Sequence, residues 1–363
     1  MRKPPAFRND PLPHFLILFC FVLWLPTTAS SEETLARYEA SAFHMGQKFS
    51  LALYAPSDKA AEEASKLVFD RIEELDRTLS DYRPDSELSR LCSSAKPGVP
   101  VPVSDDLFNV LQASLNASRE TDGLFDVTVA PLVQLWRAAR RTKRLPDATA
   151  LQAALAVVGY RNVTLHETPR SVEFAQAGMR IDVGGIGVGW ALDDVGSRLR
   201  KSGITRFLVD GSGDILCGDP PPGRDAWRIA VQPLTEKGEE TVLLSIRNCA
   251  VTTSGDAYRF VEIDGRRYSH IVDPRTGMGL TERSSVTVIA PTAVVADSFA
   301  KGVNILGPER GMEFINARPE LAGSFVVLRR GDGDASEPRT PVRVVSKRFH
   351  EFVEGADEIP SVK

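Results

Sequence analysis

The stretch Asp182-Val-Gly-Gly-Ile-Gly-Val-Gly-Trp190 separates two parts of the chain that differ in character. An apolar, strand-like segment leads into it, and a helix is predicted after it from Ala191 to Ser202. Four glycines between a strand and a helix let backbone N–H groups approach an anion at the helix N-terminus. A nucleotide pyrophosphate would fit there, and a tight strand-to-helix turn is the other interpretation. The glycine spacing does not match that of a dinucleotide-binding Rossmann unit.

The residues after this stretch are rich in short apolar runs bounded by turn residues. Strands are predicted over 207–209, 227–231, 241–246, 268–272, 285–290 and 325–328. A helix is predicted from Thr292 to near Gly307, and a polar loop over 331–341. No repeat of fixed period is present.

The residues before the stretch contain three predicted helices and one predicted strand. Apolar residues recur at three- and four-residue steps over 59–79, and residues 49–54 alternate like a half-buried strand. Ser104 and Asp147 are predicted to begin the other two helices, which end near Gly123 and Gly159. Strands and helices mixed without regular βαβ alternation indicate an α+β fold in a single large domain.

The first thirty residues are typical of a secretory signal peptide. Arg2, Lys3 and Arg8 precede the unbroken apolar run 15–25, and small residues follow at 28–30. Eleven apolar residues span roughly 16 Å as a helix, about half of a bilayer core. We therefore expect a signal peptide over 1–30 with cleavage after Ser30, a domain over 31–345 and a C-terminal tail over 346–363. The alternative is a buried hydrophobic helix.

Composition excludes several other classes of protein. The chain has 363 residues and a net charge of −4, and its basic residues are scattered, so nucleic acid is a poor candidate for a partner. Removal of the signal leaves Cys92, Cys217 and Cys249, which are odd in number and form no Cys-x-x-Cys pair. A zinc site built on these thiols is disfavoured, and at most one disulfide can form.

Three further segments contain candidate chemistry, each with a structural alternative. The turn Asp210–Asp214 is able to hold a phosphate or a cation, although acidic glycine turns are common in hairpins. Hydroxyls at 252–254, with His270 and neighbouring carboxylates, suit acid–base work on a phosphoanhydride, although a single histidine beside Asp-Pro is more often structural. Asp297 and Lys301 lie four residues apart on a predicted helix, so they share a face. The structural alternative is a surface ion pair, which would contribute little to stability.

The order of these segments resembles that of the FAD:protein FMN transferases, the ApbE-like family, along nearly the whole mature chain. The matching stretches are 44–46, 79–88, 123–133, 135–136, 182–190, 253–256, 269–277 and 285–291. The resemblance implies an ApbE-like α+β fold after the signal segment. It also implies cleavage of the FAD pyrophosphate and transfer of FMN to a Ser or Thr hydroxyl of an exported acceptor flavoprotein, with release of AMP and assistance from Mg²⁺. The expected location is periplasmic, or on the outer side of the inner membrane, where only the acceptor would bring the enzyme near the membrane.

The same resemblance assigns site residues by position. Flavin contacts are expected at Met45, Tyr82, Leu124, Phe125, Asp126, Asp182, Val188 and Val272. His270 is the expected base for the acceptor hydroxyl. The Mg²⁺ position falls at the backbone oxygen of Gly185, the carboxylate of Asp297 and residue 301.

Two residues depart from the family pattern. Val188 stands where the family usually has lysine, and Lys301 stands where it usually has a threonine hydroxyl that binds the metal. An ammonium has three donors and no lone pair, so it cannot ligate Mg²⁺. Lys301 therefore either replaces the missing lysine and part of the charge of the metal, or pairs with Asp297 in a protein that binds FAD without turnover. A purely structural exported protein is the third and least favoured class.

Overall fold

The computed structural model describes residues 34–234, 241–255, 259–329 and 340–355. The expected signal peptide and Asp256 lie outside these residues, and so does nearly all of the polar loop expected over 331–341. Residues Leu35–Lys363 form one compact unit. Within the part of the chain that is described, no helix has the length and apolar character needed to cross a bilayer.

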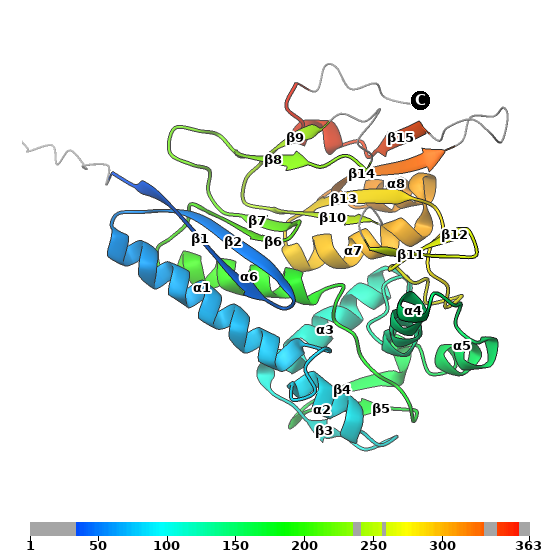
Figure 1. Cartoon of the computed structure of the whole chain (residues 1–363). Helices are drawn as coiled ribbons and strands as arrows, with labels where there is room; N and C mark the ends of the chain where they lie inside the picture. The colour runs from blue at the N-terminus through cyan, green and yellow to red at the C-terminus, as the bar shows by residue number, and fades with distance from the viewer. Residues whose placement is uncertain (1–33, 235–240, 256–258, 330–339, 356–363) are drawn as a thin grey trace, which may run out of the picture. The chain divides into compact units, whose positions relative to one another are not determined.

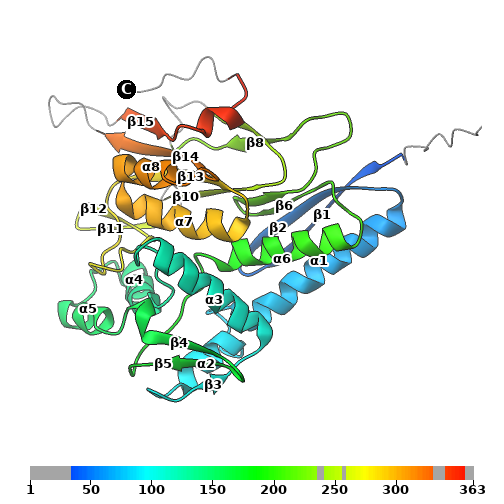
Figure 2. The same ribbon diagram turned by 180° about the vertical axis from the view of Figure 1, so that it is seen from behind.

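Helices and strands are interspersed along this unit, as Figures 1 and 2 show from opposite sides. The helices are α1 (Asp58–Leu79), α2 (Glu87–Ser94), α3 (Asp105–Glu120), α4 (Ala130–Thr142), α5 (Ala148–Leu155), α6 (Gly187–Lys201), α7 (Ala293–Leu306) and α8 (Pro308–Asn316), with short 3₁₀ turns η1 (Tyr160–Asn162) and η2 (Phe349–Phe352). The strands are β1 (Ala36–His44), β2 (Gln47–Ala55), β3 (Val101–Pro102), β4 (Val163–Glu167), β5 (Arg170–Phe174), β6 (Phe207–Gly211), β7 (Asp214–Cys217), β8 (Trp227–Val231), β9 (Val242–Ile246), β10 (Ala250–Gly255), β11 (Phe260–Ile263), β12 (Arg266–Ser269), β13 (Ser284–Ala290), β14 (Ala322–Arg329) and β15 (Thr340–Val345).

The main sheet has eight strands in the order β1-β2-β6-β7-β10-β13-β14-β15. Every neighbouring pair in it is antiparallel. Successive side chains of a strand point to opposite faces, so both faces of β2 find partners. Phe49, Leu51 and Leu53 belong to the large core beneath the helices, whereas Ala52 and Tyr54 pack on the opposite side.

Helices α1, α6, α7 and α8 cover one face of this sheet (Figure 1). The apolar residues of α1 recur every three or four positions, and the six that are buried run from Ala61 to Leu79 on one side. Ser57 begins the helix by accepting a hydrogen bond from the N–H of Ala60, at 3.3 Å. The arrangement places the N-terminus of α6, where the glycine segment ends, next to α7.

The other face of the sheet is covered by the β8–β9 hairpin and the residues after β15. Trp227 and Leu244 of the hairpin share a hydrophobic cluster with Phe349 of η2, which is fully buried. Val353 forms an isolated bridge with Leu244. Residues 346–355, which the sequence analysis places in a tail, thus pack as part of the folded unit because Phe349 completes this cluster.

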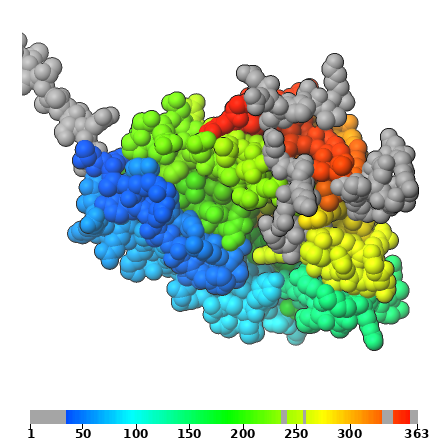
Figure 3. Space-filling model, turned by 45° about the horizontal axis from the view of Figure 1, so that its top comes forward, coloured from blue at the N-terminus to red at the C-terminus, as the bar shows by residue number. Residues whose placement is uncertain are grey.

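A second group of elements packs beside the helical layer. Here β3, β5 and β4 form a small sheet, and the β11–β12 hairpin shares a cluster with α4, in which Trp136 lies 5.1 Å from Tyr268 between ring centroids. Figure 3 shows on one face of the molecule the yellow segment that contains this hairpin, lying beside the α4–α5 segment. Trp136 Nε1–H donates to the carbonyl of Gly277 at 2.8 Å, which ties the loop after β12 to α4.

The α+β expectation is confirmed, and most of the predicted elements are present with shifted ends. Helix α6 begins at Gly187, four residues before its predicted start. The helix predicted to end at Gly159 stops at Leu155. The strand predicted over 268–272 ends at Ser269, and Val272 keeps only a bridge to Gly279. The three cysteines that follow the expected signal are free thiols.

Candidate active site

The glycine segment forms a tight turn into α6. Asp182 Oδ1 accepts a hydrogen bond from the N–H of Gly184 at 2.7 Å. A Cβ on Gly184 would lie 2.8 Å from this same oxygen, so glycine is needed there for the carboxylate to fold back on the turn. The N–H groups of Ile186 and Gly187 both bond to the carbonyl of Val183, at 3.0 and 2.7 Å. The segment therefore forms the tight strand-to-helix turn that was the alternative to a pyrophosphate site. This turn leads directly into the N-terminus of α6.

Arg137 connects two of the expected flavin contacts. Its Nη2 lies 2.6 Å from Oδ2 of Asp81 and 3.5 Å from Oδ2 of Asp182. Its guanidinium also lies over the ring of Tyr82, 4.2 Å from the centroid. Burial and the charge of Asp81 raise the pKa of Asp182 to about 6, although the Gly184 N–H and Arg137 act in the opposite direction. The Tyr82 side chain is 77% exposed, so an aromatic face is available at the rim of this group.

Asp297 and Lys301 on α7 meet the glycine segment. The Asp297 side chain is 1% exposed, and its Oδ1 forms an ion pair with the Lys301 ammonium. Its Oδ2 accepts from the N–H of Gly189 at 3.2 Å. A Cβ on Gly185 would lie 3.7 Å from Cγ and Cε of Lys301 and 3.1 Å from Cε2 of Phe125. The structure therefore brings Gly185, Phe125, Asp297 and Lys301 together, while the roles that the resemblance implies for them stay predictions.

Asp214, the last residue of the acidic turn for which the sequence offers phosphate or cation binding, is a third charged member of this cluster. It begins β7, directly after the β6–β7 turn, in which Ser212 and Gly213 have φ of 57° and 107°. Burial and the charge of Asp297 raise the pKa of Asp214 to about 7, while the charge of Lys301 acts in the opposite direction. The acidic turn 210–214 was the sequence signal for this residue. It is a hairpin turn, and its last carboxylate lies close enough to Asp297 and Lys301 for their charges to act on it.

His270 lies near the same cluster, at the end of β12. Burial lowers its pKa to about 4, and the charges of Lys301, Arg259 and Arg140 act in the same direction, although the backbone of Arg259 opposes them. Its Nδ1 lies 3.1 Å from the carbonyl oxygen of Arg259. Because a carbonyl only accepts, Nδ1 carries the proton and Nε2 keeps its lone pair. His270 is thus a neutral base at neutral pH.

The other expected flavin contacts have structural partners of their own. Asp126 accepts hydrogen bonds from the N–H and hydroxyl of Thr128 and from the N–H of Tyr160, at 2.6–2.9 Å. Met45 lies in the β1–β2 turn with φ of 50°.

Three more expected contacts lie in packed regions. Leu124 packs against Gly302 of α7, where an added Cβ would lie 3.6 Å from its own Cβ. Val188 packs against Gly211 of β6, and Val272 is buried in the α4 cluster. These residues shape the surroundings of the cluster but do not join its charged groups.

The residues present do not fit a Mg²⁺ ion in this arrangement. Mg²⁺ needs an octahedron of oxygens, but one oxygen of Asp297 is paired with an ammonium and the other accepts from Gly189. An ammonium held about 4 Å from a divalent ion would repel it by roughly 8 kcal/mol at an effective dielectric of 20. Among the described residues, no group of three or more acidic, histidine or cysteine side chains is arranged to hold a metal.

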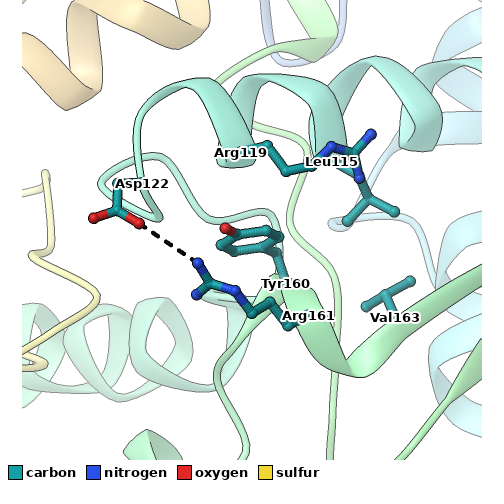
Figure 4. Close-up of a pocket in the computed structure, with 6 residues that line it drawn as sticks. All are labelled: Leu115, Arg119, Asp122, Tyr160, Arg161 and Val163. Atoms are coloured by element: carbon teal, nitrogen blue, oxygen red, sulfur yellow. Dashed lines mark hydrogen bonds and ion pairs between the residues drawn. The ribbon is translucent and has the colours of Figure 1, made fainter.

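Two hollows of the surface lie away from this cluster. One of about 440 Å³ lies where α3 ends, lined by Leu115, Arg119, Asp122, Tyr160, Arg161 and Val163 (Figure 4). Its Asp122–Arg161 ion pair, at 3.5 Å, is largely exposed. Another, of about 390 Å³, lies at the N-terminus of α7 beside Trp190 and Asp193. Neither is lined by an expected site residue, so the charged cluster is the better candidate for chemistry.

Comparisons with known proteins agree with the resemblance. The model of the ApbE family matches residues 45–325. The chain is 31% identical to a FAD:protein FMN transferase of Klebsiella pneumoniae over 297 residues, which are 80% of this chain and 83% of the relative. It is also 31% identical to the FAD:protein FMN transferase of Escherichia coli K12, over 76% of this chain and 79% of that protein.

Solved structures show the same likeness. The apo crystal structure of the Pseudomonas stutzeri flavinyl transferase ApbE matches with a TM-score of 0.75 and 30% identity, over 88% of this chain and 97% of that one. The flavin transferase ApbE of Vibrio cholerae matches with a TM-score of 0.75 and 28% identity, over 88% and 99%. The expected resemblance is confirmed: this chain belongs to the ApbE family.

Proposed function

We propose that the protein transfers FMN from FAD to a Ser or Thr hydroxyl of an exported acceptor protein and releases AMP. The observation that carries the proposal is the position of His270, a neutral base with a free lone pair on Nε2, near the Asp297–Lys301 cluster. The names of the relatives support the reaction class.

His270 takes part in the proton transfer, and α6 and Lys301 act on the negative charge of the phosphates. The acceptor oxygen forms a bond to the phosphorus of the FMN half, and His270 Nε2 accepts the hydroxyl proton. The bond from that phosphorus to the bridging oxygen breaks, and AMP leaves with the electron pair. In this proposal the positive end of α6 and the Lys301 ammonium stabilise the negative charge that develops on the phosphates.

Mg²⁺ is left out of these steps because the cluster does not fit it. The Mg²⁺ requirement implied by the family resemblance stays a prediction. If the ion does take part, Lys301 must first leave Asp297.

A second candidate function is FAD binding without turnover, in an exported protein. The Lys301–Asp297 ion pair favours it, since the pair occupies a carboxylate that the family resemblance assigns to the metal.

One experiment separates the two candidates. The mature protein is incubated with FAD and synthetic peptides carrying a central Ser or Thr, with Mg²⁺ or with EDTA, and AMP is followed by chromatography. Transfer predicts AMP together with peptides heavier by one FMN less one water. Tight FAD binding with neither product in either condition would support the second candidate instead.

A further inference from the structure

Lys301 is held in place by the protein on two sides. Its ammonium pairs with Asp297, which is almost fully buried, and the exposed fraction of its own side chain is 21%. Its aliphatic stem passes over Gly185, since Cγ and Cε both lie 3.7 Å from the position of a Cβ on that glycine. A lysine anchored along its stem and at its tip is unlike a mobile surface lysine. Its charge therefore has a fixed place beside the glycine segment.

This fixed place is where the family resemblance puts a divalent cation. Gly185 lies beside the stem of Lys301 and Asp297 pairs with its ammonium, and the Asp297 carboxylate has both oxygens engaged. The ammonium of Lys301 thus already supplies a positive charge at this position, as part of the chain itself. Lysine binds phosphate as a point charge, so an ammonium suits the same anionic group that a divalent ion would neutralise.

Two arginines add positive charge near His270. Arg259 and Arg140, with Lys301, are the cations whose charges act on His270. The carboxylates of Asp297 and Asp214 compensate Lys301 in the free protein. An arriving pyrophosphate would compete with these carboxylates for the ammonium, while the arginines would add attraction.

We propose that Lys301 is a substrate-binding residue that contacts the pyrophosphate of FAD, and that it makes FAD binding by this protein independent of a divalent metal. This rests on FAD being the substrate, as in the proposed function. Beyond the proposed function, it states that the cation that binds the pyrophosphate is the Lys301 side chain.

The test measures FAD affinity in EDTA and in Mg²⁺ for the mature protein and three variants. The wild type should bind FAD with the same dissociation constant in both. Lys301→Met keeps most of the stem but has no charge, so its affinity should fall roughly tenfold or more in both conditions. Lys301→Thr should lose the same affinity in EDTA and regain it in Mg²⁺, because its hydroxyl can bind the ion. Lys301→Arg should retain binding in EDTA.

Two controls make the outcome specific. Lys201→Thr removes an exposed charge at the end of α6 and should change nothing. Riboflavin lacks phosphates, so its affinity should be the same for the wild type and Lys301→Met. The proposal fails if EDTA weakens FAD binding by the wild type tenfold, or if Lys301→Met binds FAD as the wild type does. If FMN transfer then occurs only when Mg²⁺ is present, the proposed function still stands. Absence of FAD binding under every condition would overturn both the role of Lys301 and the proposed function.

Discussion

Replacement of Gly189 by alanine tests the contact that positions the site. A Cβ on Gly189 would lie 2.4 Å from the carbonyl oxygen of Ala293, 2.7 Å from its carbonyl carbon and 3.0 Å from Cβ of Asp297. The first two are backbone atoms, which cannot rotate away, so α6 and α7 would have to separate. The hydrogen bond from the Gly189 N–H to Asp297, now 3.2 Å, would lengthen as they did.

The cost follows from two opposing effects. Overpacking a close contact costs about 1–3 kcal/mol, and the backbone clash puts this case at the upper end. Alanine gains roughly 0.5–1 kcal/mol over glycine inside a helix, so the net loss should be about 2 kcal/mol. Gly187→Ala is the matched control on the same helix, since its Cβ would lie 3.4 Å from a side-chain methyl of Val183. It should leave stability unchanged or raise it by up to about 0.5 kcal/mol.

Urea unfolding of the mature protein, followed by tryptophan fluorescence, measures both variants. The midpoint of Gly189→Ala should fall with an unchanged m-value, and that of Gly187→Ala should not. Equal midpoints for the two variants would refute the close approach of α6 to α7. The account of how Asp297 is held against the glycine segment would then be wrong.

The remaining predictions concern three other side chains. His270→Gln should slow FMN transfer by about 10²–10⁴ without changing FAD affinity. Because burial lowers the pKa of His270 to about 4, protonation removes the base only below that pH, so the acid limb of the wild-type rate should fall near pH 4 and not near 6.5. Tyr82→Ala should raise the FAD dissociation constant about tenfold while Tyr82→Phe does not, and equal affinities would exclude a ring contact. Arg71→Ala should lower the free energy of unfolding by about 2–3 kcal/mol, because Asp106 and Asp194 lose a shared partner that is 10% exposed; an unchanged urea midpoint would contradict this.

The sequence predicts the elements whose ends carry local signals. Ser104, Asp147 and Thr292 each begin a helix as predicted, and each side chain accepts a hydrogen bond from an N–H three residues later. The start of helix α6 was predicted too late because two of its first three residues, Gly187 and Gly189, are glycines with poor helix propensity. Gly189 is helical there because close packing against Ala293 of α7 outweighs that propensity.

Elements without local signals were missed. The edge strand β1 alternates polar and less polar residues, but these are mostly charged or small and few are strong strand formers, so its pairing with β2 decides its structure. Helix α4 begins without a side-chain cap.

The site residues also divide into those that the sequence predicts and those that only the tertiary fold reveals. Gly185, Asp297, Lys301 and His270 were predicted from the resemblance, and the structure places them in one region. Arg137 was not, because its partners lie far away in sequence: it meets Asp81 and Asp182. Such contacts depend on the tertiary fold, which no local pattern contains.

The central claim is that this protein moves FMN from FAD to a hydroxyl, with His270 as the base. Its most direct test is the stoichiometry of AMP and flavinylated acceptor, measured by chromatography and intact-mass spectrometry on the same samples, with His270→Gln as the matched variant. The account predicts one AMP for each acceptor molecule that gains FMN, with both products greatly reduced in the variant. AMP without any flavinylated acceptor, or equal amounts of both products from His270→Gln and the wild type, would contradict it.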